Sequence, residues 1–201
     1  MGLPVIRSNQ MSIAEYLRRE RDSLEKHEYR DGEALLMAGG TANHSLIVAN
    51  VIGELRGRLK GTPCRVYDGN LRVRIPPTVL FTYPDLSIIC GQRRLDAQDG
   101  NGETVTNPRV IIEVLSPTTE GYDRGEKFSR YRQLDSLEEY VLVSQQTPRV
   151  ESFLRQAGGT WLLTAVEGVA SVANIRCLNV ELPLSEVYAG VEFGLEQETP
   201  G

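Results

Sequence analysis

The sequence predicts an α/β fold in which helices flank a mixed β-sheet. Helical spacing of apolar residues marks residues 41–61 and residues 118–134, and runs typical of β-strands lie between and after these segments. The order is helix, three strands, helix and strand, with extra strands at both ends, as expected for a sheet covered by helices. The chain has 201 residues and 40% hydrophobic residues. We therefore expect a single domain over residues 1–201, with its core at about residues 27–166.

A helix and a hairpin are the first predicted elements. Residues 12–24, "SIAEYLRRERDSL", predict a short helix with Ser12 as a candidate N-cap. In "KHEYRDGEALLMAG", the pair Asp31-Gly32 separates two short strand-like runs and indicates a hairpin turn. The helix within residues 41–61 follows, and Gly61 suits its C-terminus.

Six further segments are predicted to contain strands. They are residues 64–75, 85–90, 109–115, 138–144, 149–156 and 160–166. Pro117 ends the third of these, and Thr118 or Thr119 is placed to cap the helix of residues 118–134. From about residue 190 we expect a loose acidic tail containing Glu192, Glu196 and Glu198.

Composition excludes several classes of protein. No apolar run reaches the ~20 residues that span a bilayer, and the first ten residues lack the apolar core of a signal peptide. The three cysteines include no Cys-x-x-Cys pair, and there are only two histidines, so we expect no zinc site. Cys90 is interpreted as a small buried side chain. These features predict a cytoplasmic protein that does not associate with membranes.

Basic residues are clustered although the net charge is −5. Such local clusters can bind phosphate groups even in an acidic chain, and solvated faces of a strand and a helix are the alternative interpretation. The clusters are Arg56, Arg58, Lys60, Arg65, Arg72 and Arg74, and then Arg124, Lys127, Arg130 and Arg132.

Two carboxylates occupy positions where a charge is costly. Asp85 begins the apolar run "DLSIIC", and Glu113 lies inside the apolar run "RVIIEVL". The segment between the runs is polar and contains glycine, with its centre near Asp99, so it predicts a turn. If the two runs pair antiparallel about this turn, Asp85 lies opposite Glu113 on one face of the sheet.

Two carboxylates that face each other need a proton or a cation to reduce their repulsion. Their β-carbons would be ~5 Å apart, where like charges repel, so one acid is protonated or a cation lies between them. Hard oxygen ligands suit Mg²⁺ or Mn²⁺. The alternative is that Asp85 caps a turn after Pro84 and Glu113 pairs with a buried Arg or Lys.

A lysine on the following helix is a candidate partner. Arg124, Lys127, Tyr131 and Leu134 recur at helical spacing. If Tyr131 and Leu134 pack on the sheet, Lys127 lies near the end of the strand that carries Glu113. A cation there would stabilise charge on a phosphate or orient a water. A lysine that only extends its ammonium group into solvent is the alternative.

Four segments carry a family resemblance: "HEYRDGEALLMAGGTANHSLIVANVIGEL", "YPDLSIICG", "NPRVIIEVLSPTTEGYDRGEKFSRYRQL" and "EEYVLVSQQTPRVESF". They resemble the Uma2 family, also catalogued as a domain of unknown function, which is similar to PD-(D/E)XK nucleases such as restriction endonucleases. The likeness runs from about His27 to Phe153. It implies a restriction-endonuclease-like core with the order αβββαβ, which agrees with the order predicted from the pattern.

The resemblance also implies a site. In the wider superfamily an Asp and a Glu hold one or two divalent ions, and a Lys follows the Glu by two residues. By resemblance, Asp85 and Glu113 are ligands for Mg²⁺ or Mn²⁺, with the backbone carbonyl of Val114 as a further ligand. Leu115 stands at the expected lysine position, which suggests that Lys127 supplies the cation from the helix.

The family resemblance suggests three other candidate site residues. His44, near the start of its helix, would contact substrate or a metal-bound water, and a polar residue in the first helical turn is the alternative. Glu28 and Glu33 flank the predicted hairpin and are placed to reach the site.

The expected activity is therefore that of a Mg-dependent endodeoxyribonuclease, a hydrolase of phosphodiester bonds in DNA. A two-fold homodimer is the default arrangement for cleaving both strands. Because Leu115 replaces the usual lysine, a weak or inactive nuclease-like module that binds nucleic acid or protein is the first alternative. A hydrolase of another substrate, with the two carboxylates as acid and base, is the second.

Overall fold

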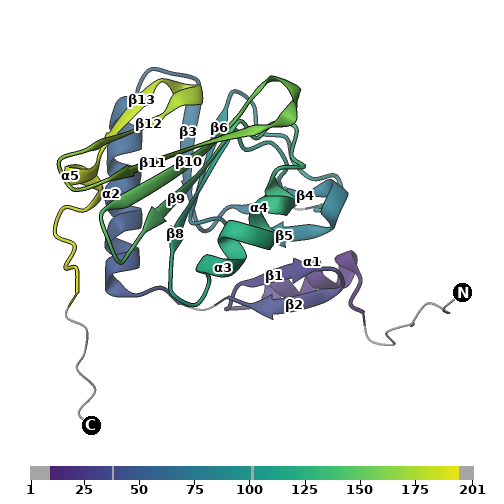
Figure 1. Cartoon of the computed structure of the whole chain (residues 1–201). Helices are drawn as coiled ribbons and strands as arrows, with labels where there is room; N and C mark the ends of the chain where they lie inside the picture. Colours follow the sequence, from purple (N-terminus) through teal and green to yellow (C-terminus); the bar gives the residue numbers. More distant parts are fainter. Residues whose placement is uncertain (1–9, 38, 101, 195–201) are drawn as a thin grey trace, which may run out of the picture.

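The computed structural model describes residues 10–37, 39–100 and 102–194, which form two larger β-sheets and a separate hairpin (Figure 1). The helices are α1 (Ile13–Asp22), α2 (Ala42–Arg58), α3 (Glu120–Tyr122), α4 (Phe128–Tyr131) and α5 (Leu184–Val187), and a π-helical turn, η2 (Asp123–Lys127), joins α3 to α4. The 3-10 turns are η1 (Pro76–Thr78), η3 (Ala157–Gly159) and η4 (Arg176–Leu178). The strands are β1 (His27–Arg30), β2 (Glu33–Leu36), β3 (Cys64–Asp68), β4 (Arg72–Ile75), β5 (Leu80–Thr82), β6 (Leu86–Cys90), β7 (Thr104–Val105), β8 (Val110–Leu115), β9 (Glu139–Ser144), β10 (Arg149–Arg155), β11 (Trp161–Glu167), β12 (Val172–Ile175) and β13 (Val180–Pro183).

The six-stranded sheet contains the predicted core. Its strand order is β11-β10-β9-β8-β6-β3, with β8 parallel to β9 and the other neighbours antiparallel. Along the chain the core runs α2, β3, β6, β8, α3–η2–α4 and β9, so the order αβββαβ is confirmed. Glu196 and Glu198 of the expected acidic tail lie outside the described residues.

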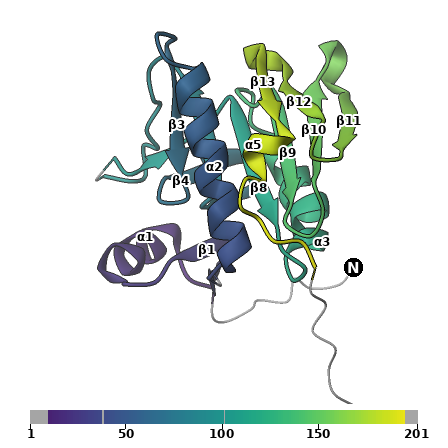
Figure 2. The same ribbon diagram turned by 90° about the vertical axis from the view of Figure 1, so that its left-hand side faces the viewer.

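Helices cover both faces of this sheet. All six residues of β8 are buried, and alternate side chains enter two different cores. Val110, Ile112 and Val114 pack with α2, whereas Ile111 and Leu115 pack with α4. Figure 2 shows α2 in front of the sheet, with α3 behind it. Glu113 therefore lies on the face that the α3–η2–α4 segment covers.

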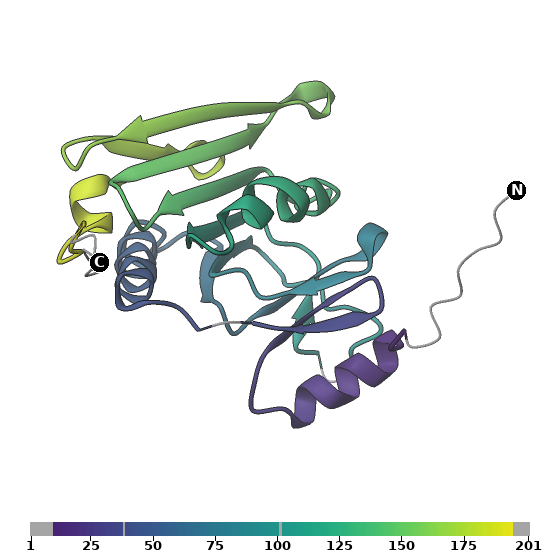
Figure 3. The same cartoon turned by 60° about the horizontal axis from the view of Figure 1, so that its bottom comes forward.

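The second sheet corrects the prediction of one mixed sheet. Its order is β2-β1-β5-β4-β7, so the segment predicted as residues 64–75 divides between two sheets, β3 in one and β4 in the other. The chain leaves the first sheet at a turn between Asp68 and Leu71. Figure 3 shows the β1–β2 hairpin and α1 on the side of the molecule away from β11.

The N-terminal elements begin and turn where the sequence predicts. The Ser12 side chain accepts a hydrogen bond from the N–H of Glu15 at 3.2 Å at the start of α1. Asp31 and Gly32 have φ of 50° and 97°, as a tight two-residue hairpin turn requires. Across the described residues, no helix combines the length and apolarity needed to cross a membrane.

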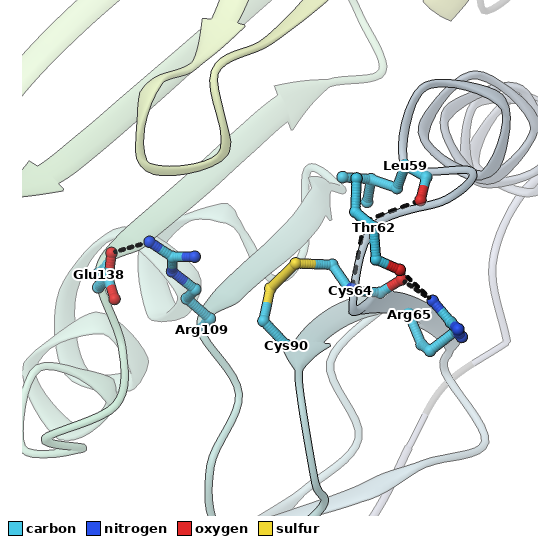
Figure 4. The surroundings of a disulfide bond; sticks show 7 residues. All are labelled: Leu59, Thr62, Cys64, Arg65, Cys90, Arg109 and Glu138. Atoms are coloured by element: carbon cyan, nitrogen blue, oxygen red, sulfur yellow. Dashed lines mark hydrogen bonds and ion pairs between the residues drawn. A yellow bond between two sulfur atoms is a disulfide. The ribbon is translucent and has the colours of Figure 1, made fainter.

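The cysteines depart from their predicted role. Antiparallel pairing of β3 with β6 places Cys64 opposite Cys90, and the two form a disulfide (Figure 4). The interpretation of Cys90 as a small buried side chain is therefore wrong, because Cys90 is half-buried and bonded to a cysteine 26 positions away in the sequence. The prediction of a cytoplasmic protein therefore loses the support that it drew from the cysteines.

Arg72 and Arg74, two of the candidate phosphate-binding residues, face inward. Arg72 is buried and donates to Asp99 at 2.9 Å and to Thr104 at 2.7 Å. Arg74 donates to both oxygens of Asp96, at 2.8 and 2.7 Å. The prediction that these two arginines hold DNA phosphates is wrong. Their partners lie in the predicted turn segment, which folds back against β4 through β7.

Arg72→Met should lower the free energy of unfolding by ~3–5 kcal/mol, because it removes one partner of a buried ion pair, the guanidinium group that donates to Asp99. Arg58→Met is the control, since the partly exposed pair of Arg58 with Glu54 should contribute less than ~1 kcal/mol. Urea denaturation of the two variants measures the difference. Equal losses would show that the buried pair is no more important to stability than the exposed one.

Candidate active site

The two predicted acids meet at the ends of neighbouring strands. The pairs Leu86↔Ile112 and Ser87↔Ile111 fix the register of β6 against β8, and it is the register predicted from the turn at Asp99. Asp85 directly precedes β6, and its N–H donates to Glu113 Oε2 at 3.3 Å. The N–H of Val114 donates to Asp85 Oδ2 at 2.7 Å. The structure thus brings both carboxylates and the backbone of Val114 to one place.

Lys127 lies directly over Glu113. Its Nζ is 2.9 Å from Glu113 Oε1, and the Tyr131 hydroxyl donates to the same oxygen at 2.9 Å. Lys127 is only 5% exposed. A lysine directed into solvent is thereby excluded, and the buried partner that Glu113 needs is Lys127. Leu115, at the lysine position of the superfamily, packs in the apolar core instead.

His44 contacts the other acid from the start of α2. Its Nε2 is 3.1 Å from Asp85 Oδ2. Thr41 caps α2 by accepting from the His44 N–H at 3.1 Å, which fixes the first turn of the helix against the site. The hydrogen bond to Asp85 raises the pKa of His44 above its usual value.

Two further carboxylates line the same cavity. Glu28 of β1 lies 3.5 Å from Lys127 Nζ and accepts from the Thr82 and Tyr122 hydroxyls, the latter at 3.3 Å. Asp123 lies 3.4 Å from the same ammonium group. Glu33, the other hairpin candidate, is exposed and does not line this cavity. Sequence reasoning missed Asp123, because a regular helical period turns Arg124 inward.

The lining of the cavity is rich in carboxylates. It has a volume of about 330 Å³, and its charged lining residues are Glu28, His44, Asp85, Glu113, Asp123 and Lys127. Burial acts to raise the pKa of Glu113, and the adjacent Lys127 ammonium group acts in the opposite direction and favours the carboxylate. Burial acts against the charged form of Lys127, but the combined charges of Glu113, Tyr131, Glu28 and Asp123 outweigh it and raise the pKa of Lys127 well above its usual value. The lysine therefore remains an ammonium group between carboxylates.

The carboxylate oxygens of Asp85 and Glu113 suit a hard divalent cation whose remaining ligands are water and substrate oxygens. Within residues 10–37, 39–100 and 102–194, no three His, Cys, Asp or Glu side chains form a complete metal-binding group. Mg²⁺ is usually bound through one or two carboxylates together with water and substrate phosphates, rather than by an all-protein cage. Asp85 and Glu113 meet this requirement.

A family model described as "Putative restriction endonuclease", Uma2, matches residues 13–185. The chain belongs to the Uma2 family. Two curated proteins of Synechocystis sp. (strain ATCC 27184 / PCC 6803 / Kazusa) are similar to this Uma2 chain. Uncharacterized protein slr1290 is 32% identical over 183 residues, which is 91% of this chain and 94% of the relative. Uncharacterized protein sll1609 is 34% identical over 158 residues, or 79% and 88% of the two chains.

A solved structure shares the fold. The crystal structure of a "putative nuclease belonging to DUF820" from Anabaena variabilis ATCC 29413 superposes with a TM-score of 0.67. The match covers 86% of this Uma2 chain and 96% of the Anabaena chain, at 16% sequence identity. The nuclease-like fold class predicted from the sequence is confirmed.

Proposed function

We propose that this Uma2 protein is a metal-dependent endonuclease that hydrolyses phosphodiester bonds in DNA. The observation that carries the proposal is the convergence of Asp85, Glu113 and Lys127 in one cavity. These are the residue types of a PD-(D/E)XK site, with the lysine supplied by the helix instead of the strand.

Asp85 and Glu113 would hold Mg²⁺ or Mn²⁺, and the carbonyl of Val114 is the proposed additional ligand. When bound, such an ion polarises a phosphate group and lowers the pKa of a coordinated water. Lys127 is placed to stabilise negative charge on a phosphate or to orient the attacking water, because its ammonium group is fixed and desolvated. His44 is placed to donate a hydrogen bond at the wall of the same cavity.

A non-catalytic module that binds nucleic acid or protein is the alternative. The observation that favours it is the closed ion pair of Glu113 with Lys127, which already neutralises one proposed metal ligand. The two functions differ in metal binding, since a module of this kind has no need of a divalent ion.

Mg²⁺ or Mn²⁺ should raise the melting temperature of the parent protein, because a ligand that binds the folded state stabilises it by mass action. Asp85→Asn and Glu113→Gln should each abolish this increase, whereas Glu33→Gln, an exposed acid outside the cavity, should retain it. Isothermal titration calorimetry checks the same variants. If the parent binds neither ion, the module is the better interpretation.

Lys127→Ala should lower Mn²⁺-dependent plasmid nicking by ~100-fold or more, as expected for the loss of a charge-stabilising or proton-transfer group. Arg124→Ala is the matched control on the same helical segment, since Arg124 pairs with Glu120 and Glu151 instead of the site acids. Single-turnover rates are measured at a temperature where circular dichroism shows all variants folded. Parental nicking by Lys127→Ala would exclude the lysine from the chemistry.

A two-fold homodimer is part of the proposal, and β11 supplies a candidate interface. This strand is an edge of the six-stranded sheet (Figure 2), and its outer edge pairs with no strand in the described part of the chain. It contains no Lys, Arg or Pro, and Leu162 and Leu163 are 46% and 50% exposed. An isologous contact centred on Thr164 would pair all seven residues of β11 with those of a second copy. Glu167 of each copy would then lie opposite Trp161 of the other copy. Arg155 stacks on Trp161, so its positive charge would lie near the negative charge of Glu167 across the interface.

Sedimentation velocity over a concentration series should show a dimer for the parent and a monomer for Thr164→Lys, which opposes two ammonium groups at the two-fold axis. Val169→Lys is the control, because Val169 is an exposed apolar residue outside β11. A parent that is monomeric at every concentration, or a dimer that survives Thr164→Lys, would remove β11 from the interface.

A further inference from the structure

The turn that carries Lys127 is not an α-helix, and this difference decides which side chains enter the cavity. Residues Asp123–Lys127 form a π-turn, which accommodates one residue more than an α-helical turn. A regular helical period counted back from Tyr131 would turn Arg124 inward. The structure instead buries Asp123, whereas Arg124 is 33% exposed and pairs with Glu120. The π-turn therefore places the Asp123 carboxylate at the site, where a regular α-helix would place the Arg124 guanidinium group.

A tyrosine from the sheet holds this turn at both ends. The hydroxyl of Tyr140, on β9, donates a hydrogen bond at 3.0 Å to the backbone carbonyl of Asp123, the first residue of the turn. The ring of Tyr140 stacks on Phe128, the residue that follows the turn, with ring centroids 4.8 Å apart. Tyr140 is fully buried, so the segment is fixed to the sheet next to the residues of the site.

The π-turn, held by Tyr140, places the Lys127 ammonium group among three carboxylates that come from three different secondary-structure elements. These are Glu113 of β8 at 2.9 Å, Asp123 of the π-turn at 3.4 Å and Glu28 of β1 at 3.5 Å. A lysine has a flexible four-carbon stem and samples several rotamers unless its surroundings fix it. Only Asp123 among the three acids is on the same turn as the lysine.

We propose that Tyr140 and Asp123 are positioning residues for Lys127. Tyr140 maintains the π-turn, and the π-turn brings Asp123 within 3.4 Å of the ammonium group, where it is a second carboxylate partner beside Glu113. The effect of these residues on cleavage rests on the proposed function. Their effect on the lysine itself does not, and it is measured separately.

The direct measurement is the NMR spectrum of the lysine ammonium groups in ¹⁵N-labelled protein. The chain has three lysines, Lys26, Lys60 and Lys127, and the first two are exposed, so only Lys127 should give a slowly exchanging signal. Asp123→Asn and Tyr140→Phe should broaden or abolish this signal. Glu120→Gln, which changes a half-buried acid on the same segment that pairs with Arg124 instead of Lys127, and Tyr188→Phe should retain it. The Tyr188 hydroxyl also donates to a backbone carbonyl, that of Ser144 at 3.0 Å, but outside the cavity.

The second measurement is single-turnover and steady-state cleavage with Mn²⁺. Asp123→Asn and Tyr140→Phe should lower kcat by about tenfold or more and change KM by less than about twofold, because a misplaced group lowers the rate more than binding. Tyr188→Phe is the control for the general loss of stability that follows when a buried hydroxyl group is removed. A Lys127 signal and a kcat unchanged in both variants would overturn the proposal. If the parent cleaves no nucleic acid, the proposed function fails, and the spectra alone decide on the positioning role.

Discussion

The buried ion pair of Lys127 with Glu113 is the interaction on which the arrangement of the site depends. Glu113 lies in the middle of a strand whose residues are all buried, where an uncompensated carboxylate would cost several kcal/mol. Its partner comes from a helical segment that reaches the sheet only after the chain leaves β8 and turns back. The pair therefore joins strand and helix, and the apolar contacts of Phe128, Tyr131 and Leu134 with the sheet form around it.

Local pattern was sufficient to predict the core order, the register of β6 against β8 and the position of Lys127. These depend on a turn between two adjacent strands and on the short path from Glu113 to the next helix. The division into two sheets, the Cys64–Cys90 pair and the burial of Arg72 were not predictable in the same way. Each depends on a contact between segments whose pairing the local pattern does not specify. Asp123 was missed for a different reason, because one additional residue in a helical turn shifts every position that precedes it.

The charged groups that line the cavity are costly to bury. Four carboxylates line the cavity together with one ammonium group and one imidazole, so the pocket without further cations is short of positive charge. An apolar or neutral lining would be easier to bury. The excess of acid is explained if the cavity is built to receive a cation, and the surrounding packed core compensates for the electrostatic cost.

The internal use of arginine has a consequence for how a polyanion would approach the molecule. Arg72 and Arg74 are held by Asp99 and Asp96, and Arg130 is held by Asp31 and Glu126, so their charges are neutralised locally. Together with the net charge of −5, this leaves little long-range attraction for DNA. Because the protein and DNA carry net charge of the same sign, long-range electrostatics would not accelerate diffusional encounter, and added salt would not slow it as it slows the association of oppositely charged partners. Productive capture would depend on contacts made inside the cavity after the collision.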